Sequence, residues 1–232
     1  MRSGLFITGT DTGVGKTYIT ALIARDLRAS GIPVGVFKPA CSGAEFSAVG
    51  EPVWPDLVAL SDAAQIVDLD RICPYRLRAP LAPPVAARAE NITLDLQEML
   101  AGFRRWQTDD ERCVLVEGVG GLLCPLTETH SIADFALLTE LPLLIVARLG
   151  LGTINHTLLT IDVAQRRGLL IAGVVLNDAQ AEADSLAAQT NLAELRRCAP
   201  VPILGVVRHN ETSLCLSLDR HAARIAWPIR GV

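Results

Sequence analysis

Short apolar runs recur along the chain, each bounded by glycine, proline or polar residues. Within each run the hydrophobic residues are nearly continuous and do not alternate with polar ones, which is typical of strands covered on both faces of a parallel sheet. The pattern predicts strands at Leu5–Thr8, Val34–Phe37, Cys113–Val116, Leu143–Val146, Ile171–Leu176 and Ile203–Val207.

Helical patterns lie between these runs, with apolar residues returning every three or four positions. One face of the first pattern carries Ile19, Leu22, Ile23 and Leu27. The predicted helices are Thr17–Ser30, Leu94–Trp106, Asn155–Arg167 and Asp184–Arg197. Strands that alternate with helices predict a doubly wound α/β fold, with a mostly parallel sheet covered by helices on both faces.

No repeat or linker divides the chain, so we expect a single domain over residues 1–232, with a tail from about residue 209 that no pattern places in the fold. The least regular internal segments are Cys41–Pro55 and Cys73–Asn91. Long loops in a compact domain are often functional.

Composition narrows the function. Half of the residues are hydrophobic and the net charge is -4, with no cluster of Lys and Arg, which argues against a nucleic-acid partner. No apolar run reaches the roughly 18 residues of a membrane span. The N-terminus leads directly into a strand and leaves no room for a signal peptide. We expect a cytoplasmic protein that acts on a small molecule.

The six cysteines are scattered, without a C-x-x-C pair. This spacing fits neither a metal site nor a disulfide framework. We expect reduced cysteines that are mostly structural.

The segment GTDTGVGKT follows the first predicted strand and opens the first helix. It is similar to the phosphate-binding pattern G-x-x-x-x-G-K-[ST], but Gly9 stands one position too early. Gly13 and Gly15 allow backbone conformations that turn N–H groups toward an anion. Lys16 supplies charge for the β- and γ-phosphates, and the Thr17 hydroxyl can ligate Mg²⁺.

Polar residues follow the other strands as well. Lys38 follows the second strand, Glu117 begins a glycine-rich run after the third, and Asn177 follows the fifth. In open α/β sheets ligands bind outside the carboxyl ends of the strands, so these residues together predict one site. Glu117 is a candidate ligand for Mg²⁺; Asp56 is another, or else only the N-cap of the helical stretch that follows it.

Seven segments together resemble the dethiobiotin synthetase family, in the order seen there: GTDTGVGKT, KPACSG, PDLVAL, APLAPPVAA, VEGVGGLLCPL, GLGTINHTLLT and GVVLND. The resemblance runs from about residue 5 to residue 207. It implies a P-loop NTPase-like domain and a reaction in which 7,8-diaminononanoate takes up CO₂ as a carbamate. ATP then phosphorylates the carbamate, and the second amine closes the ureido ring.

The resemblance also implies residue roles. Lys16 and Lys38 would hold phosphate and carbamate oxygens as catalytic residues, and Mg²⁺ would be bound by Thr17, Asp56 and Glu117. The nucleotide would contact Thr12, Gly13, Val14, Gly15, Lys16 and Thr17, with Asn177 at the adenine. The carbamate or diamine would contact Thr12, Lys38 and Ser42. In a homodimer, the substrate carboxylate would lie near the interface, at Gly152, Thr153, Ile154 and Asn155.

Three positions depart from the family pattern. Pro84 stands in a segment where many relatives carry histidine, and Gly13 stands where some carry an acidic residue. The polar residues that often precede the aspartate have no clear counterpart before Asp56.

Two alternatives belong to the same nucleotide fold. An amide-forming cobyrinic-acid synthetase needs an additional glutaminase domain, for which 232 residues leave no space. A regulatory ATPase of the partition or septum-positioning type usually carries an early lysine in the loop, where this chain has Asp11-Thr12-Gly13. The loop therefore favours the synthetase.

Overall fold

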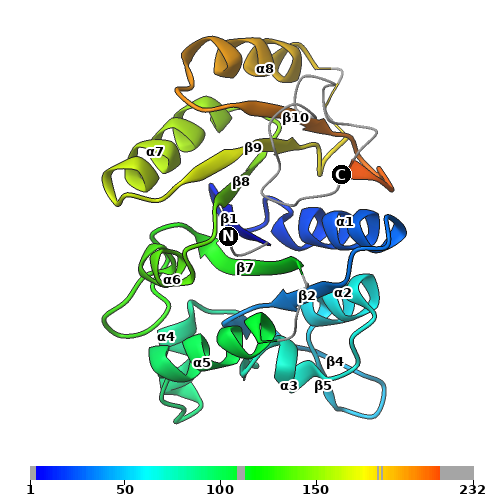
Figure 1. The fold of residues 1–232 in the computed structure, drawn as a ribbon, viewed down its shortest axis with the longest axis vertical. Helices are drawn as coiled ribbons and strands as arrows, with labels where there is room; N and C mark the ends of the chain where they lie inside the picture. Colours follow the sequence, from blue (N-terminus) through cyan, green and yellow to red (C-terminus); the bar gives the residue numbers. More distant parts are fainter. Residues whose placement is uncertain (1–3, 109–112, 182, 184, 215–232) are drawn as a thin grey trace.

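A six-stranded parallel sheet forms the centre of the molecule (Figure 1). The computed structural model describes residues 4–108, 113–181, 183 and 185–214. The strand order is β10-β9-β8-β1-β7-β2. These strands are β1 (Gly4–Gly9), β2 (Val34–Phe37), β7 (Cys113–Gly121), β8 (Leu143–Arg148), β9 (Ile171–Asn177) and β10 (Ile203–Val207). Each predicted strand is present, and the predicted doubly wound α/β fold is confirmed.

Helices cover both faces of the sheet (Figure 1). One face is covered by α1 (Lys16–Ala29), α2 (Pro55–Ala64) and α3 (Leu69–Ile72). The other is covered by α5 (Leu96–Gln107), α6 (Ile132–Thr139), α7 (Thr153–Arg166) and α8 (Leu186–Cys198). In β1, Leu5 and Ile7 pack toward the α1 side and Phe6 packs toward the opposite side. Burial on both faces explains why the strands are continuously apolar.

The two least regular segments, Cys41–Pro55 and Cys73–Asn91, contain a short helix and short strands that the sequence pattern did not predict. Helix α4 (Pro83–Ala89) lies there, together with two small two-stranded sheets. One sheet pairs β3 (Ala40–Ser42) with β6 (Tyr75–Leu77), and the other pairs β4 (Glu45–Phe46) with β5 (Pro52–Val53). Helix α6 was not predicted either. Elements of two to eight residues are too short to show a period, so the pattern of apolar residues did not predict them.

Strand β7 extends further than the apolar run predicts. The predicted strand ends at Val116, but β7 continues through Glu117 and the glycine-rich residues to Gly121. Ile7 pairs with Glu117 and Gly9 pairs with Gly121, so β7 carries extra residues in a bulge opposite β1. Glycines tolerate such a bulge, where the ladder is locally interrupted. Glu117 is therefore held within a strand and not in a turn.

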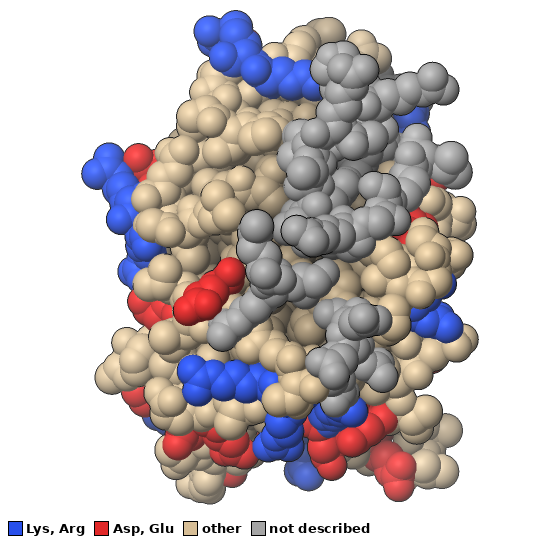
Figure 2. Space-filling view, viewed as in Figure 1, with Lys and Arg blue, Asp and Glu red and all other residues tan. Residues whose placement is uncertain are grey.

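Three of the described cysteines are buried, and the surface carries charges of both signs (Figure 2). Cys41, Cys73 and Cys113 are buried, and the described cysteines form no disulfide with one another; Cys215 lies outside the described residues. On the face shown in Figure 2, basic and acidic side chains of the described residues are interspersed. Across the described ranges, no helix is both long enough and apolar enough to cross a bilayer.

Candidate active site

The phosphate loop connects β1 to α1. The structure explains why its first glycine, Gly9, stands one position earlier than in the usual pattern. A Cβ atom on Gly9 would lie 2.7 Å from the carbonyl oxygen of Asp11 and 2.8 Å from Cγ2 of Val14. The loop folds back over the end of β1, and only glycine leaves room for it. Lys16 begins α1 and donates a hydrogen bond from Nζ to the Asp11 carbonyl oxygen at 3.3 Å. The displaced glycine thus belongs to the path of this loop.

Asn177 supports the same loop from the end of β9. Its Nδ2 donates a hydrogen bond to the carbonyl oxygen of Val14 at 3.0 Å. Gly15 lies against this amide, because a Cβ atom there would stand 2.0 Å from Nδ2. Gly15 also has φ 92°, in the left-handed region that favours glycine. Asn177 therefore has a role in the loop that the sequence did not indicate, and its contact with adenine stays a prediction.

Lys38 and Glu117 meet because two neighbouring strands share a register. Phe37 of β2 pairs with Val116 of β7, so the next residue of each strand emerges side by side. The Lys38 Nζ lies 2.5 Å from Oε1 of Glu117 and 2.5 Å from Oδ2 of Asp56. The Lys38 side chain is 3% exposed and that of Glu117 is 0% exposed. One buried ammonium thus joins carboxylates from β7 and from the first turn of α2.

Burial and ion pairing shift the pKa values of Lys38 and Asp56 in opposite directions. Burial alone would lower the pKa of Lys38, but Glu117 and Asp56 outweigh it, and the pKa lies above its ordinary value. Burial would raise the pKa of Asp56, yet the ammonium of Lys38 beside it makes the net shift downward. Lys16 differs, since burial lowers its pKa and Glu117 offsets this only in part. Lys38 and Asp56 are therefore held as an ion pair at neutral pH.

The oxygen atoms of this cluster fit a divalent cation. The Thr17 hydroxyl donates to Oε1 of Glu117 at 2.7 Å. The other carboxylate oxygen of Glu117, Oε2, is buried and has no hydrogen-bond partner in the described part of the chain. Mg²⁺ prefers oxygen ligands and usually combines one or two carboxylates with phosphate oxygens and water. Thr17, Asp56 and Glu117 supply that donor set beside the phosphate loop.

A cavity of about 380 Å³ opens between the phosphate loop and Lys38. It brings together most of the predicted site residues, since it is lined by Thr12, Gly13, Gly15, Lys16, Thr17, Lys38, Ser42, Asp56, Val119 and Gly120. Val119 and Gly120 were not predicted as site residues, although the glycine-rich run after Glu117 was the available signal. Glu117 does not line the cavity, but its carboxylate bonds to Thr17 and Lys38, which do.

Other predicted residues lie elsewhere. Gly152, Thr153, Ile154 and Asn155 form the start of α7, after β8, and do not line this cavity. Asn177 touches the loop but does not line the cavity either. Pro84 lies in the first turn of α4. The N-cap of α2 is Trp54, so the alternative that Asp56 serves only as an N-cap is wrong.

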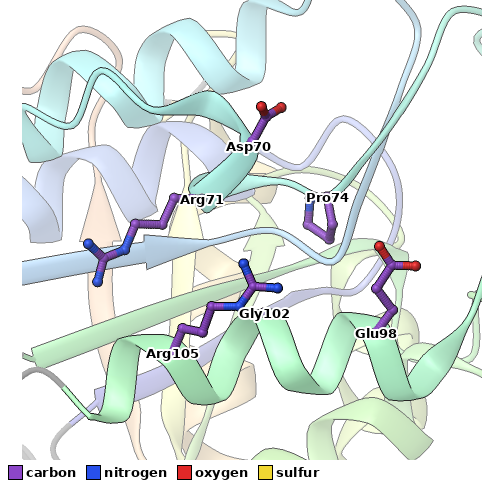
Figure 3. Close-up of a pocket in the computed structure, with 6 residues that line it drawn as sticks. All are labelled: Asp70, Arg71, Pro74, Glu98, Gly102 and Arg105. Atoms are coloured by element: carbon purple, nitrogen blue, oxygen red, sulfur yellow. The ribbon is translucent and has the colours of Figure 1, made fainter.

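A second hollow, of about 260 Å³, lies between α3 and α5 (Figure 3). Its lining is formed by Asp70, Arg71, Pro74, Glu98, Gly102 and Arg105. Two of its charged side chains already have partners within the protein: the Arg71 guanidinium stacks 3.9 Å from the ring centre of Trp106, and Glu98 accepts a hydrogen bond from the Tyr75 hydroxyl. None of its lining residues comes from the phosphate loop, and we assign the site to the first cavity.

Comparison with known proteins identifies the family. A family model described as an AAA domain matches residues 3–214. The ATP-dependent dethiobiotin synthetase BioD of Anaeromyxobacter sp. strain Fw109-5 is 47% identical over 195 residues, which are 84% of this chain and 84% of that protein. The BioD of Anoxybacillus flavithermus is 37% identical over 207 residues, which are 89% of this chain and 91% of that protein.

Solved structures support the fold. The signal recognition particle receptor FtsY from Elizabethkingia anophelis matches 98% of this chain with a TM-score of 0.56 and 13% identity, and the chain spans 65% of that protein. The septum site-determining protein MinD from Pyrococcus horikoshii matches 90% of this chain and 82% of its own length, with a TM-score of 0.55 and 17% identity. Such low identities show the P-loop NTPase fold alone and add no support for a septum-positioning role. By its identity to the BioD proteins over most of its length, the chain belongs to the ATP-dependent dethiobiotin synthetase family.

Proposed function

We propose that this chain is the ATP-dependent ligase that closes the ureido ring of dethiobiotin, and that the reaction takes place in the cavity between the phosphate loop and Lys38. The observation that carries the proposal is the position of Lys38. A buried lysine clamped by two carboxylates faces the same cavity as Lys16 of the phosphate loop. A second lysine outside the phosphate loop adds positive charge where a negatively charged acceptor such as a carbamate would lie.

The proposed substrates are 7,8-diaminononanoate and CO₂. One amine adds to CO₂ and releases a proton, which gives a carbamate. A carbamate oxygen then attacks the γ-phosphorus of ATP, and ADP leaves. The second amine attacks the carbonyl carbon of this mixed anhydride, the ring closes, and phosphate leaves with a further proton.

The residues of the cavity have matching proposed roles. Phosphoryl transfer depends mainly on positioning and on stabilising negative charge, which Lys16 and Lys38 supply to the phosphate and carbamate oxygens. Thr12 and Ser42 line the cavity and offer hydroxyl groups to the carbamate or the diamine. Thr17, Asp56 and Glu117 would hold Mg²⁺. When bound, the metal would neutralise charge on the phosphate oxygens.

The remaining assignments concern the ends of the substrates. Asn177 is proposed to contact adenine with the part of its amide that Val14 does not use. The start of α7, from Gly152 to Asn155, is proposed to bind the substrate carboxylate through its N–H groups in a homodimer. Leu151 and Leu159 are 86% and 56% exposed in this region, which supports an interface there. We further propose a single cytoplasmic domain.

A coupled assay of ADP release tests the proposal. With ATP, Mg²⁺ and bicarbonate present, ADP formation should require 7,8-diaminononanoate, and mass spectrometry should detect dethiobiotin. Lys38→Ala should lower turnover by at least about 10²-fold, the scale for one charge-stabilising group. A matched control is Arg28→Ala on the outer part of α1, which should keep turnover. ADP release at the same rate with and without 7,8-diaminononanoate would refute the proposed synthetase function.

A further inference from the structure

The ammonium of Lys38 lies between two carboxylates, whose negative charges need a positive partner before any ligand binds. This ammonium has three N–H donors, and Glu117 and Asp56 each accept one at 2.5 Å. Both carboxylates are also the proposed ligands of Mg²⁺. The same two carboxylates would therefore serve two cations, one resident in the chain and one that would arrive with the nucleotide.

The carboxylates of Asp56 and Glu117 need a cation beside them whether or not a metal is bound. Glu117 is fully buried, and its Oε2 lacks a hydrogen-bond partner among the described residues. Asp56 reaches the same ammonium, so the two negative charges lie close together. A buried carboxylate without a counter-charge is strongly unfavourable, and a second carboxylate beside it adds repulsion. Lys38 keeps Asp56 and Glu117 assembled while no metal is present.

Lys16 provides the contrast. It lines the same cavity, but it donates to the backbone carbonyl oxygen of Asp11. Lys16 is thus oriented by the loop itself, whereas Lys38 is oriented by the proposed metal ligands. Lys16 and Lys38 are also the only lysines among the 232 residues, which allows each to be observed separately.

We propose that Lys38 is a resident cation that the divalent metal displaces. Before nucleotide binding, Lys38 holds Asp56 and Glu117 together. When Mg²⁺ arrives with ATP and takes up these carboxylates, the ammonium is released toward the phosphate and carbamate oxygens. Metal binding and the delivery of the catalytic lysine are then one exchange, and ATP without metal leaves Lys38 in place. This inference rests on the proposed function, which includes the metal site.

Metal binding to the nucleotide-free protein tests the exchange without any turnover. Mn²⁺ serves as the probe, and electron paramagnetic resonance measures its unbound fraction. Lys38→Met should bind Mn²⁺ at least tenfold more tightly than the wild type, because both carboxylates lose their internal cation. Lys16→Met is the matched control and should gain less than threefold. Equal affinities of Lys38→Met and wild type, or an equal gain in Lys16→Met, would overturn the proposal.

A second measurement uses the wild-type protein, in case Lys38→Met fails to fold. Labelling with ¹⁵N-lysine gives two side-chain ammonium signals, which Lys16→Met assigns. The Lys38 signal should stay in place with a non-hydrolysable ATP analogue in EDTA and should shift when Mg²⁺ is added. A shift with the analogue alone, or no shift with Mg²⁺, contradicts the exchange.

Two further variants separate this inference from the proposed function. Asp56→Asn and Glu117→Gln should each weaken Mn²⁺ binding in the presence of the ATP analogue. If they do so while Lys38 shows no response to the metal, the exchange is refuted and the metal site stands. If neither variant weakens binding, the metal assignment itself is refuted, and the exchange with it.

Discussion

Gly15 and Asn177 form a contact whose energy can be measured by a double-mutant cycle. In Gly15→Ala, the new Cβ atom would lie 2.0 Å from Nδ2 and 3.1 Å from Cγ of Asn177. The amide has to leave its position, and the Val14 carbonyl oxygen loses its hydrogen bond. The substitution also puts a side chain on a residue with φ 92°.

The expected cost follows from these two effects. A left-handed conformation costs an alanine about 1–2 kcal/mol. A buried carbonyl group that loses its partner costs about 1–3 kcal/mol. Gly15→Ala should therefore lower the free energy of unfolding by about 2–5 kcal/mol, and Asn177→Ala should lower it by about 1–3 kcal/mol.

In the double variant the hydrogen bond is lost only once. Cβ of residue 177 is 3.9 Å from the new Cβ at residue 15, an ordinary contact distance, so the clash disappears. The double variant should be as stable as Gly15→Ala alone, within about 0.5 kcal/mol, which corresponds to a coupling energy of about 1–3 kcal/mol.

Urea unfolding of the four nucleotide-free proteins measures this coupling, provided that the m-value is unchanged. Gly13→Ala is the control, because Gly13 has φ 73° but its new Cβ atom would meet no other atom within 4 Å. Its cost should add to that of Asn177→Ala. If the costs of Gly15→Ala and Asn177→Ala also add within about 0.5 kcal/mol, Asn177 does not support the loop as described.

Further predictions concern other parts of the molecule. Lys16→Ala should lower turnover by at least about 10²-fold in the ADP assay, and near-normal turnover would remove Lys16 from the phosphate site. Gly35→Ala should lower the free energy of unfolding by about 1–3 kcal/mol in urea, because its Cβ would lie 2.7 Å from the Trp106 ring; an unchanged urea midpoint would contradict that packing. Burial would raise the pKa of Asp134, but hydrogen bonds from Ser131 and the charge of Arg167 outweigh it and lower the pKa. Ionised Asp134 therefore stabilises the fold above its ordinary pKa, and that stability is lost as the pH falls through the lowered value. Asp134→Asn should cost about 1 kcal/mol at pH 7 and much less at pH 3 in urea unfolding, whereas an equal cost at both would refute this origin.

Much of the fold follows from patterns that are local in the chain. Burial on both faces makes each central strand a continuous apolar run, and the positions of β2 and β10 match the prediction residue for residue. The phosphate loop is likewise a local motif, since its residues lie together because they are consecutive. Helix α6 and the small sheets escaped prediction because such short elements depend on packing and not on their own periodicity.

In the candidate site, too, local patterns predicted the residues but not their contacts. Lys38, Asp56 and Glu117 could each be named from their places after or before a predicted element. Their contact could not, because it depends on β2 lying next to β7 with Phe37 opposite Val116. Strand order and register join segments 79 residues apart, as Lys38 and Glu117 are, and no local pattern encodes them.

Residue types and short-range periodicity were thus enough to predict a parallel α/β nucleotide-binding fold and most members of its site. Only the tertiary structure decided that one ammonium joins two carboxylates, that β7 bulges beyond Glu117, and that Asn177 supports the phosphate loop. These features arise where separate strands meet, and their energies come from contacts across the sheet. The residue types identify the functional groups of the site, whereas the order and register of the strands decide which of these groups come into contact.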